Sequence, residues 1–209
     1  FVVICGDMTH DQNSVEQRAK VFNIARQLSN EIDLHWVAGN HDVGKDPTKE
    51  SLEKYRKNYG SDNYSFQAGQ HSFIVLNSAI CFDPVNVENE WISLKIFLDS
   101  ELEKSDSVNS NGAILFTHHP LFLKSPDESD SGHAIPSENR KEILNIVSKH
   151  NVRAIYSGHL HRNNYARLNN TDLISSGSVG YPLGVDPSGV RLVELDQGKM
   201  THNYISLED

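Results

Sequence analysis

The chain has 209 residues, of which 37% are hydrophobic, and its 19 basic and 28 acidic side chains give a formal net charge of −9. The acidic excess argues against a nucleic-acid-binding surface, and every apolar run is far shorter than the roughly 20 residues of a membrane span. Two cysteines, Cys5 and Cys81, are too few for a disulfide scaffold. We therefore expect a cytoplasmic protein with reduced thiols.

The first half of the chain predicts alternating strands and helices. Phe1–Cys5 is a continuous apolar run, as in a buried strand. Apolar residues at intervals of three and four predict helices over Asn13–Glu31 and Trp91–Leu102, and Thr48 and Gly60 are suited to cap a helix between them. Further strands are expected at Leu34–Ala38, Tyr64–Gln67 and His71–Asn77.

The second half continues the alternation and then becomes rich in strands. Ala113–Phe116 and Val152–Tyr156 are apolar runs typical of buried strands, and Ser137 is expected to cap a helix that reaches His150. Short strands are expected at Leu173–Ile174, Val190–Leu195 and Met200–Ile205, the last after a turn at Asp196-Gln197-Gly198. This order predicts an α/β domain with mixed sheets.

Four predicted strands each end in a polar cluster. The clusters are Gly6-Asp7, Gly39-Asn40-His41-Asp42, His118-His119 and His159-x-His161. Ligands of open α/β sheets bind at the carboxyl ends of the strands, so these clusters can converge on one site. Carboxylate, amide and imidazole ligands suit Zn, Fe or Mn, and a shared carboxylate can hold two ions about 3.5–4 Å apart.

Each motif is weak when it is taken alone. Gly-Asp after a strand is a common turn, and eleven histidines produce chance pairs. The ordered set is far more specific, because each motif follows its own predicted strand. Gly39 and Gly158 directly precede ligand candidates, where we expect a close approach of backbone that a Cβ would obstruct.

In this order the motifs resemble those of the calcineurin-like metallophosphoesterases, over nearly the whole chain. The resemblance implies one phosphoesterase domain over residues 1–209, folded as a four-layer α/β/β/α sandwich with two mixed β-sheets. It also implies two divalent metal ions, Mn, Fe or Zn, as cofactors.

The resemblance also implies a role for each matching residue. Asp7 would bridge both ions, and His161 would bind the first. The second ion would be held by Asp7 with Asn40, His118 and His159, whereas His119 would be only a neighbour. His41 would be catalytic, donating a proton or hydrogen bond to the leaving oxygen, while a hydroxide on the metal attacks phosphorus.

Two departures from the family pattern affect these expectations. No Asp-x-His motif precedes Gly6-Asp7, so we expect an N-terminally truncated domain with one strand missing, one tightly bound ion and a weakly bound second. His10 and Ala38 stand where the phosphatases closest to calcineurin carry Asp and Arg. Arg162 is a candidate substitute for that arginine and is equally consistent with a surface residue.

The predicted function is hydrolysis of phosphomonoesters, with phosphoserine and phosphothreonine on proteins as one substrate class. A phosphodiesterase with the same dinuclear core is an alternative, as is a metal-binding or interaction scaffold with impaired catalysis. The expected partners are a phosphorylated protein or a small phosphoester, and neither nucleic acid nor a membrane. The polar loop from Ser125 to His133 could border the substrate crevice.

Overall fold

The computed structural model describes residues 1–108, 111–196 and 198–208. A six-stranded mixed sheet forms its centre. The two outer strands pair antiparallel with their neighbours, and the four inner strands are parallel to one another. In spatial order the strands are β3 (Tyr64–Ala68), β4 (His71–Val75), β5 (Ala113–Phe116), β6 (Val152–Ser157), β8 (Thr171–Ser175) and β7 (Asn164–Leu168).

Two smaller sheets and six helices complete the described part of the chain. Strands β1 (Val2–Ile4) and β2 (Leu34–Trp36) pair in parallel, and β9 (Gly189–Asp196) and β10 (Lys199–Ser206) form an antiparallel hairpin. The helices are α1 (Val15–Ala25), α2 (Asn40–Val43), α3 (Lys49–Tyr59), α4 (Ser78–Phe82), α5 (Glu88–Val108) and α6 (Ser137–Val147). Within the described ranges, none of these helices has the length and apolar character required to cross a membrane.

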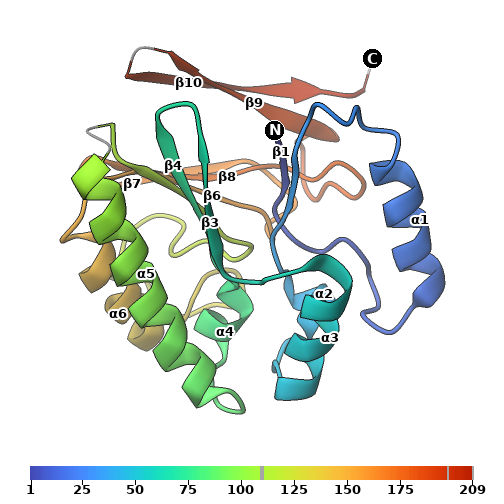
Figure 1. Ribbon diagram of the computed structural model, residues 1–209, viewed down its shortest axis with the longest axis horizontal. Coiled ribbons are helices and arrows are strands. Elements are labelled where there is room, and N and C mark those ends of the chain that lie inside the picture. The colour runs from blue at the N-terminus through green and yellow to red at the C-terminus, as the bar shows by residue number, and fades with distance from the viewer. Residues whose placement is uncertain (109–110, 197, 209) are drawn as a thin grey trace.

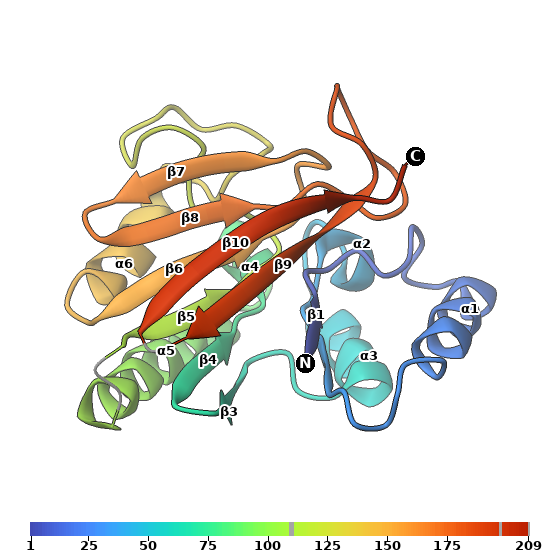
Figure 2. The ribbon, with the colours of Figure 1, turned by 90° about the horizontal axis from the view of Figure 1, so that it is seen from above.

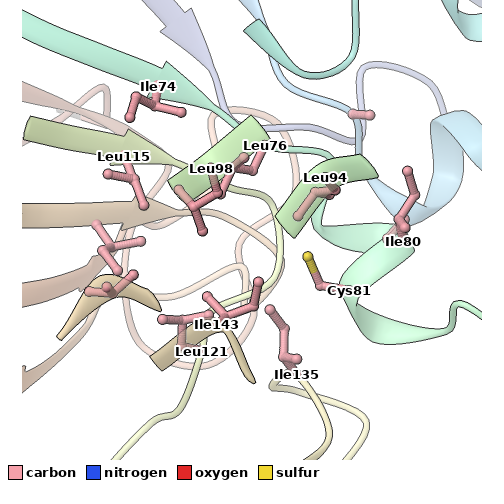
Figure 3. Packing of buried hydrophobic residues seen from close by; sticks show 14 of the residues in the cluster. Ile74, Leu76, Ile80, Cys81, Leu94, Leu98, Leu115, Leu121, Ile135 and Ile143 are labelled. Atoms are coloured by element: carbon pink, nitrogen blue, oxygen red, sulfur yellow. The ribbon is translucent and has the colours of Figure 1, made fainter. Parts of the chain in front are cut away.

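The six-stranded sheet buries both of its faces, because alternate side chains of a strand point to opposite sides. On one face, Ile74 and Leu115 pack with Leu98 of α5 and Ile143 of α6, as Figure 3 shows. On the other face, Phe73, Phe116 and Tyr156 pack with Val3 of β1 and with Val193, Leu195 and Met200 of the hairpin. Helices therefore cover one face and a second β layer covers the other (Figures 1 and 2).

Helices α1 and α3 pack on β2 through aromatic rings. Phe22 of α1 stacks on Tyr59 of α3 at 5.3 Å and meets the edge of Trp36 at 5.9 Å. These contacts complete the expected α/β/β/α sandwich. The second β layer consists of two separate two-stranded sheets among the described residues.

Most predicted elements are confirmed, and three short ones were not predicted. The helix expected over Asn13–Glu31 is shorter and ends at Ala25. None of its eleven residues, all of which the structure describes, is buried. Pro136, and not Ser137, is the N-cap of α6. Helices α2 and α4 and strand β7 are additional elements, and the predicted turn at residues 196–198 includes Gln197, which lies outside the described residues.

Candidate metal and catalytic site

Four polar clusters meet at the carboxyl ends of strands from both β layers. Asp7 follows β1, and Asn40 begins α2 shortly after β2. His118 follows β5 and His159 follows β6. The expected convergence of these motifs on one edge is therefore present in the structure.

The imidazole of His118 lies at the centre of the cluster. Its Nε2 atom is 3.2 Å from Oδ2 of Asp7, 3.1 Å from Oδ1 of Asn40 and 3.2 Å from Nδ1 of His159. Protein ligands lie about 2.1 Å from a zinc-like ion, so two ligands of the same ion are about 3.0–3.4 Å apart. Each of these three atoms is spaced from Nε2 of His118 as a second ligand of the same cation would be. Among the described His, Cys, Asp and Glu side chains, those whose ligand atoms all lie within 4.8 Å of one another are His118, His119 and His159.

Backbone carbonyls orient the two imidazoles so that lone pairs face the cluster. Nδ1 of His118 lies 2.7 Å from the carbonyl oxygen of Cys5, and Nε2 of His159 lies 3.0 Å from that of Gly132. A carbonyl only accepts, so these nitrogens carry protons. In the neutral rings, the opposite nitrogens are then acceptors. Acceptor atoms of Asp7, Asn40 and His159 then each face Nε2 of His118, and a proton or a cation at that nitrogen relieves the repulsion.

The pKa values of these residues are shifted by burial and by the pairing of Asp7 with His118. Burial alone would raise the pKa of Asp7, but the hydrogen bond and charge of His118 hold it below its usual value. Burial would likewise lower the pKa of His118, but the Asp7 carboxylate raises it. The pKa of His159 falls to about 4 because the ring is buried and lies beside His118.

His41, the predicted catalytic residue, is held at both its backbone and its ring. Its backbone N–H donates to Oδ1 of Asp7 at 2.9 Å, and its Nδ1 lies 2.8 Å from the carbonyl oxygen of His10. The rings of His10 and His41 stack with their centroids 4.9 Å apart. The contact at Nδ1 leaves Nε2 available to donate a proton. His10 therefore orients His41 through its backbone carbonyl, although the sequence comparison treated it only as a missing carboxylate.

His161 is held by hydrogen bonds to a neighbouring loop. Its Nδ1 lies 2.6 Å from the carbonyl oxygen of Tyr181, and its own carbonyl accepts from the N–H of Leu183 at 2.9 Å. Its predicted role as a ligand of the first ion stays a prediction.

Asp42 is a buried residue of the Gly-Asn-His-Asp motif to which no role was assigned from sequence. Its carboxylate accepts from the backbone N–H of Asp7 at 2.8 Å, of Gly39 at 2.9 Å and of Thr9 at 3.4 Å. Burial raises its pKa to about 6. Asp42 joins the loops after β1 and β2, and its place in the motif was the available signal.

Ser78 and His119 form a second layer behind His118. The Ser78 hydroxyl accepts from the backbone N–H groups of His118 and His119 at 3.0 and 2.8 Å, and it lies 3.1 Å from Nδ1 of His119. A ligand atom of His119 is also within 4.8 Å of those of His118 and His159. Burial lowers the pKa of His119 well below its usual value. We expect it to support His118 as a neutral neighbour.

The backbone near Asp7, His159 and His161 is closely packed and in part strained. A Cβ on Gly39 would lie 2.3 Å from Oδ1 of Asp7, and one on Gly158 would lie 2.7 Å from the carbonyl oxygen of Cys5. Asp7, His159 and His161 have positive φ angles of 56°, 66° and 54°. Such backbone strain in residues other than glycine is concentrated at functional sites in proteins.

Comparisons with known proteins place this site in a family. Residues 1–163 match the family model described as calcineurin-like phosphoesterase. The serine/threonine-protein phosphatase CPPED1 of Mus musculus is 34% identical over all of this chain and 68% of its own length. A solved structure titled as GAP50, the anchor in the inner membrane complex of Plasmodium, has a TM-score of 0.73 at 14% identity, covering 100% of this chain and 74% of that one.

A second solved structure, a dimetal phosphatase from Danio rerio, has a TM-score of 0.57 at 18% identity. It covers 84% of this chain and 72% of its own. At these identities the two structures support the fold alone. From the family model and the full-length similarity to CPPED1, we conclude that the chain belongs to the calcineurin-like phosphoesterases, a family of hydrolases that use divalent metal ions.

Proposed function

We propose that this chain is a metal-dependent phosphatase that hydrolyses phosphomonoesters, including phosphoserine and phosphothreonine on proteins. The proposal depends chiefly on the convergence of Asp7, Asn40 and His159 on Nε2 of His118. The name of the mouse relative, a serine/threonine-protein phosphatase, supports the substrate class.

The four converging side chains would hold one divalent ion, and Asp7 with His161 would contribute to a second. Manganese, iron and zinc all suit this set of oxygen and nitrogen ligands. Such ions neutralise phosphate charge and lower the pKa of bound water. The carbonyls of Cys5 and Gly132 keep the lone pairs of His118 and His159 directed at the ion position.

His41 would protonate the leaving oxygen as the phosphoester bond breaks. Its Nδ1 is bonded to the carbonyl of His10, which fixes the ring plane. Its backbone N–H is bonded to Asp7, so the acid is held at a fixed place relative to the metal ligands. General acid catalysis by a positioned side chain contributes about 10²–10⁴ in rate.

The test compares hydrolysis of p-nitrophenyl phosphate, its bis ester and a phosphoserine peptide by the Mn²⁺-loaded protein. We expect turnover of the monoester and the peptide. His41→Ala should reduce that turnover by about 10²–10⁴ while metal content is unchanged. In the control His10→Ala, the carbonyl that orients His41 remains, so turnover should fall by less than about tenfold.

Three results would contradict parts of this proposal. Preference for the bis ester would indicate a phosphodiesterase with the same site. Bound metal without turnover of any substrate would indicate a scaffold with impaired catalysis. Unchanged turnover in His41→Ala would remove His41 from the role of acid.

A further inference from the structure

A loop beside the candidate site exposes a group of apolar side chains. Val179, Tyr181, Leu183 and Val185 lie within seven residues, and Tyr181 and Val185 are 68% and 98% exposed. Apolar side chains scattered singly on a surface are normal, whereas a group of them indicates an interaction site.

Hydrogen bonds fix this loop to the site. The carbonyl oxygen of Tyr181 lies 2.6 Å from Nδ1 of His161, and the N–H of Leu183 donates to the carbonyl of His161 at 2.9 Å. The Tyr181 ring also meets the His161 ring edge-on at 5.8 Å. The apolar loop is therefore continuous with the proposed catalytic site.

A depression of about 150 Å³ lies between the loop and the site. Its lining combines two leucines with two basic side chains: His133, Leu160, Arg162, Leu183 and Gly184. A volume of about 150 Å³ is enough for a benzene-sized group, and Leu160 and Leu183 supply apolar surface to this depression. Leu160 stands between His159 and His161 in the chain, so its Cα is about 3.8 Å from each of theirs.

We propose that this depression binds an apolar side chain of a phosphorylated polypeptide, one or two residues away from the phosphorylated serine or threonine. The inference rests on the proposed phosphatase function and defines its substrate class. An extended peptide advances about 3.3 Å per residue. A side chain beside the phosphorylated residue can therefore reach the depression while the phosphate is at the metal ligands.

The charged residues of the lining also favour a phosphorylated polypeptide as the molecule that binds there. Arg162 and His133 line the depression of a chain whose net charge is −9. The ring of His133 lies 6.5 Å from that of His159, and Arg162 directly follows His161 in the chain. In the proposal these two residues lie toward the phosphate, and the leucines receive the neighbouring apolar side chain. The overall negative charge disfavours an anionic membrane surface as the partner.

The experiment uses pairs of phosphoserine peptides that differ only in leucine or glutamine at one of the two positions on either side of the phosphoserine. The ratio of kcat/KM within each pair is measured for the Mn²⁺-loaded protein. Labelled peptides are also titrated into the metal-free protein by fluorescence anisotropy, so the preference is measured even without turnover. We expect the leucine peptide to be favoured about tenfold at one or more positions.

Variants of Leu183 test whether this side chain provides the preference. Leu183→Ser should reduce the ratio to about one, and Leu183→Lys should favour a peptide with glutamate at that position over leucine. The preference of Leu183→Lys for glutamate would be a new property, and a misfolded protein would not acquire it. Ile92→Ser, a similarly exposed apolar position on α5, should keep the ratio of the unmodified protein.

Several outcomes would overturn the inference, and they are distinguishable from failure of the proposed function. Equal kcat/KM and equal binding for both peptides in every pair would contradict the apolar subsite but not the proposed phosphatase function. Turnover of p-nitrophenyl phosphate without binding or turnover of any peptide rejects protein substrates and the subsite together. Sedimentation of the protein with phosphatidylcholine vesicles that Leu183→Ser abolishes, without a peptide preference, would assign the loop to membranes.

Discussion

At the scale of single residues, the site depends on groups that only accept hydrogen bonds. The rings of His118, His159 and His41 each direct one nitrogen at a backbone carbonyl, which leaves the other nitrogen facing the site. From the motifs it could be predicted that Asp7, Asn40, His118 and His159 lie at one edge. Their carbonyl partners could not be predicted, because any residue carries a carbonyl and only the folded backbone determines where it points.

The hydrogen bonds of Asp42 to the loops after β1 and β2 lead to a prediction about stability and metal affinity. Asp42→Ala leaves three backbone N–H groups without their acceptor, and we expect a loss of about 3 kcal/mol in the free energy of unfolding. Asp42→Asn keeps one acceptor oxygen and should lose about half as much. Because these loops carry Asp7 and Asn40, Mn²⁺ affinity should fall about 10–100-fold in the alanine variant.

Urea denaturation of the metal-free protein and calorimetric titration with Mn²⁺ measure the two effects of Asp42. Asp46→Ala, a nearby exposed aspartate, is the control and should change stability by less than about 0.5 kcal/mol. An Asp42→Ala variant as stable as this control would show that the three N–H groups find water or other acceptors.

At the scale of elements, helix caps and apolar periodicity in the sequence were enough to predict the longer helices. Helix α3 begins and ends as expected, because Thr48 accepts from the N–H of Ser51 and Gly60 follows the last turn. Helices α2 and α4 are only four and five residues long, too short to show an apolar period. Helix α2 also lies within the Gly-Asn-His-Asp motif, whose polar residues indicated a loop.

His150 links two elements and provides a prediction about pH. Its ring follows α6 and contacts Asp106 at 2.8 Å and Asp99 at 3.0 Å, both on α5. Partial burial would lower its pKa, but hydrogen bonds that the ring donates to the two carboxylates raise it above the usual value. A raised pKa means that the folded state binds the proton more tightly than the unfolded state. The stabilisation is therefore complete below about pH 6.5 and is lost as the pH rises through the folded-state pKa.

Replacement of His150 by asparagine should lower the free energy of unfolding, because the contacts between His150 and the two aspartates of α5 are lost. At pH 6 the free energy of unfolding should fall by about 0.5–1 kcal/mol, because Asp99 and Asp106 are partly exposed and solvent weakens the pairs. At pH 9 the loss should be smaller. Urea denaturation of the metal-free protein measures both values, and the exposed His133→Asn is the control. A loss that is larger at pH 9 would contradict the assignment.

At the scale of the whole molecule, the site joins the two β layers. Asp7 and Asn40 follow strands of the smaller sheet, and His118 and His159 follow strands of the six-stranded sheet. The hairpin β9–β10 lies beyond the family match over residues 1–163 but packs Val193 and Leu195 on the same sheet. The hairpin therefore shares the core that lies between the two β layers.

An ion that binds across both layers must stabilise the folded chain as a whole, because the unfolded chain cannot hold the four ligands together. At a Mn²⁺ concentration about 100 times its Kd, the added stability is about 2.7 kcal/mol. For a chain of this length, that corresponds to a rise in Tm of about 5–10 °C. Scanning calorimetry with Mn²⁺ and then with a chelator should show this rise and its reversal.

Asp7→Asn should lose most of the rise in Tm, because the amide weakens the ion site, whereas the control Asp33→Asn on an exposed position should keep it. Asp7, Asn40, His118 and His159 would supply four ligands to one ion, whereas Asp7 and His161 alone would contribute to the other. We therefore expect one tight and one weak Mn²⁺ site in a calorimetric titration. Two equally tight sites would contradict that expectation. An unchanged Tm at saturating Mn²⁺ would contradict the ion site itself, since binding to the folded state alone cannot leave the unfolding equilibrium unaltered.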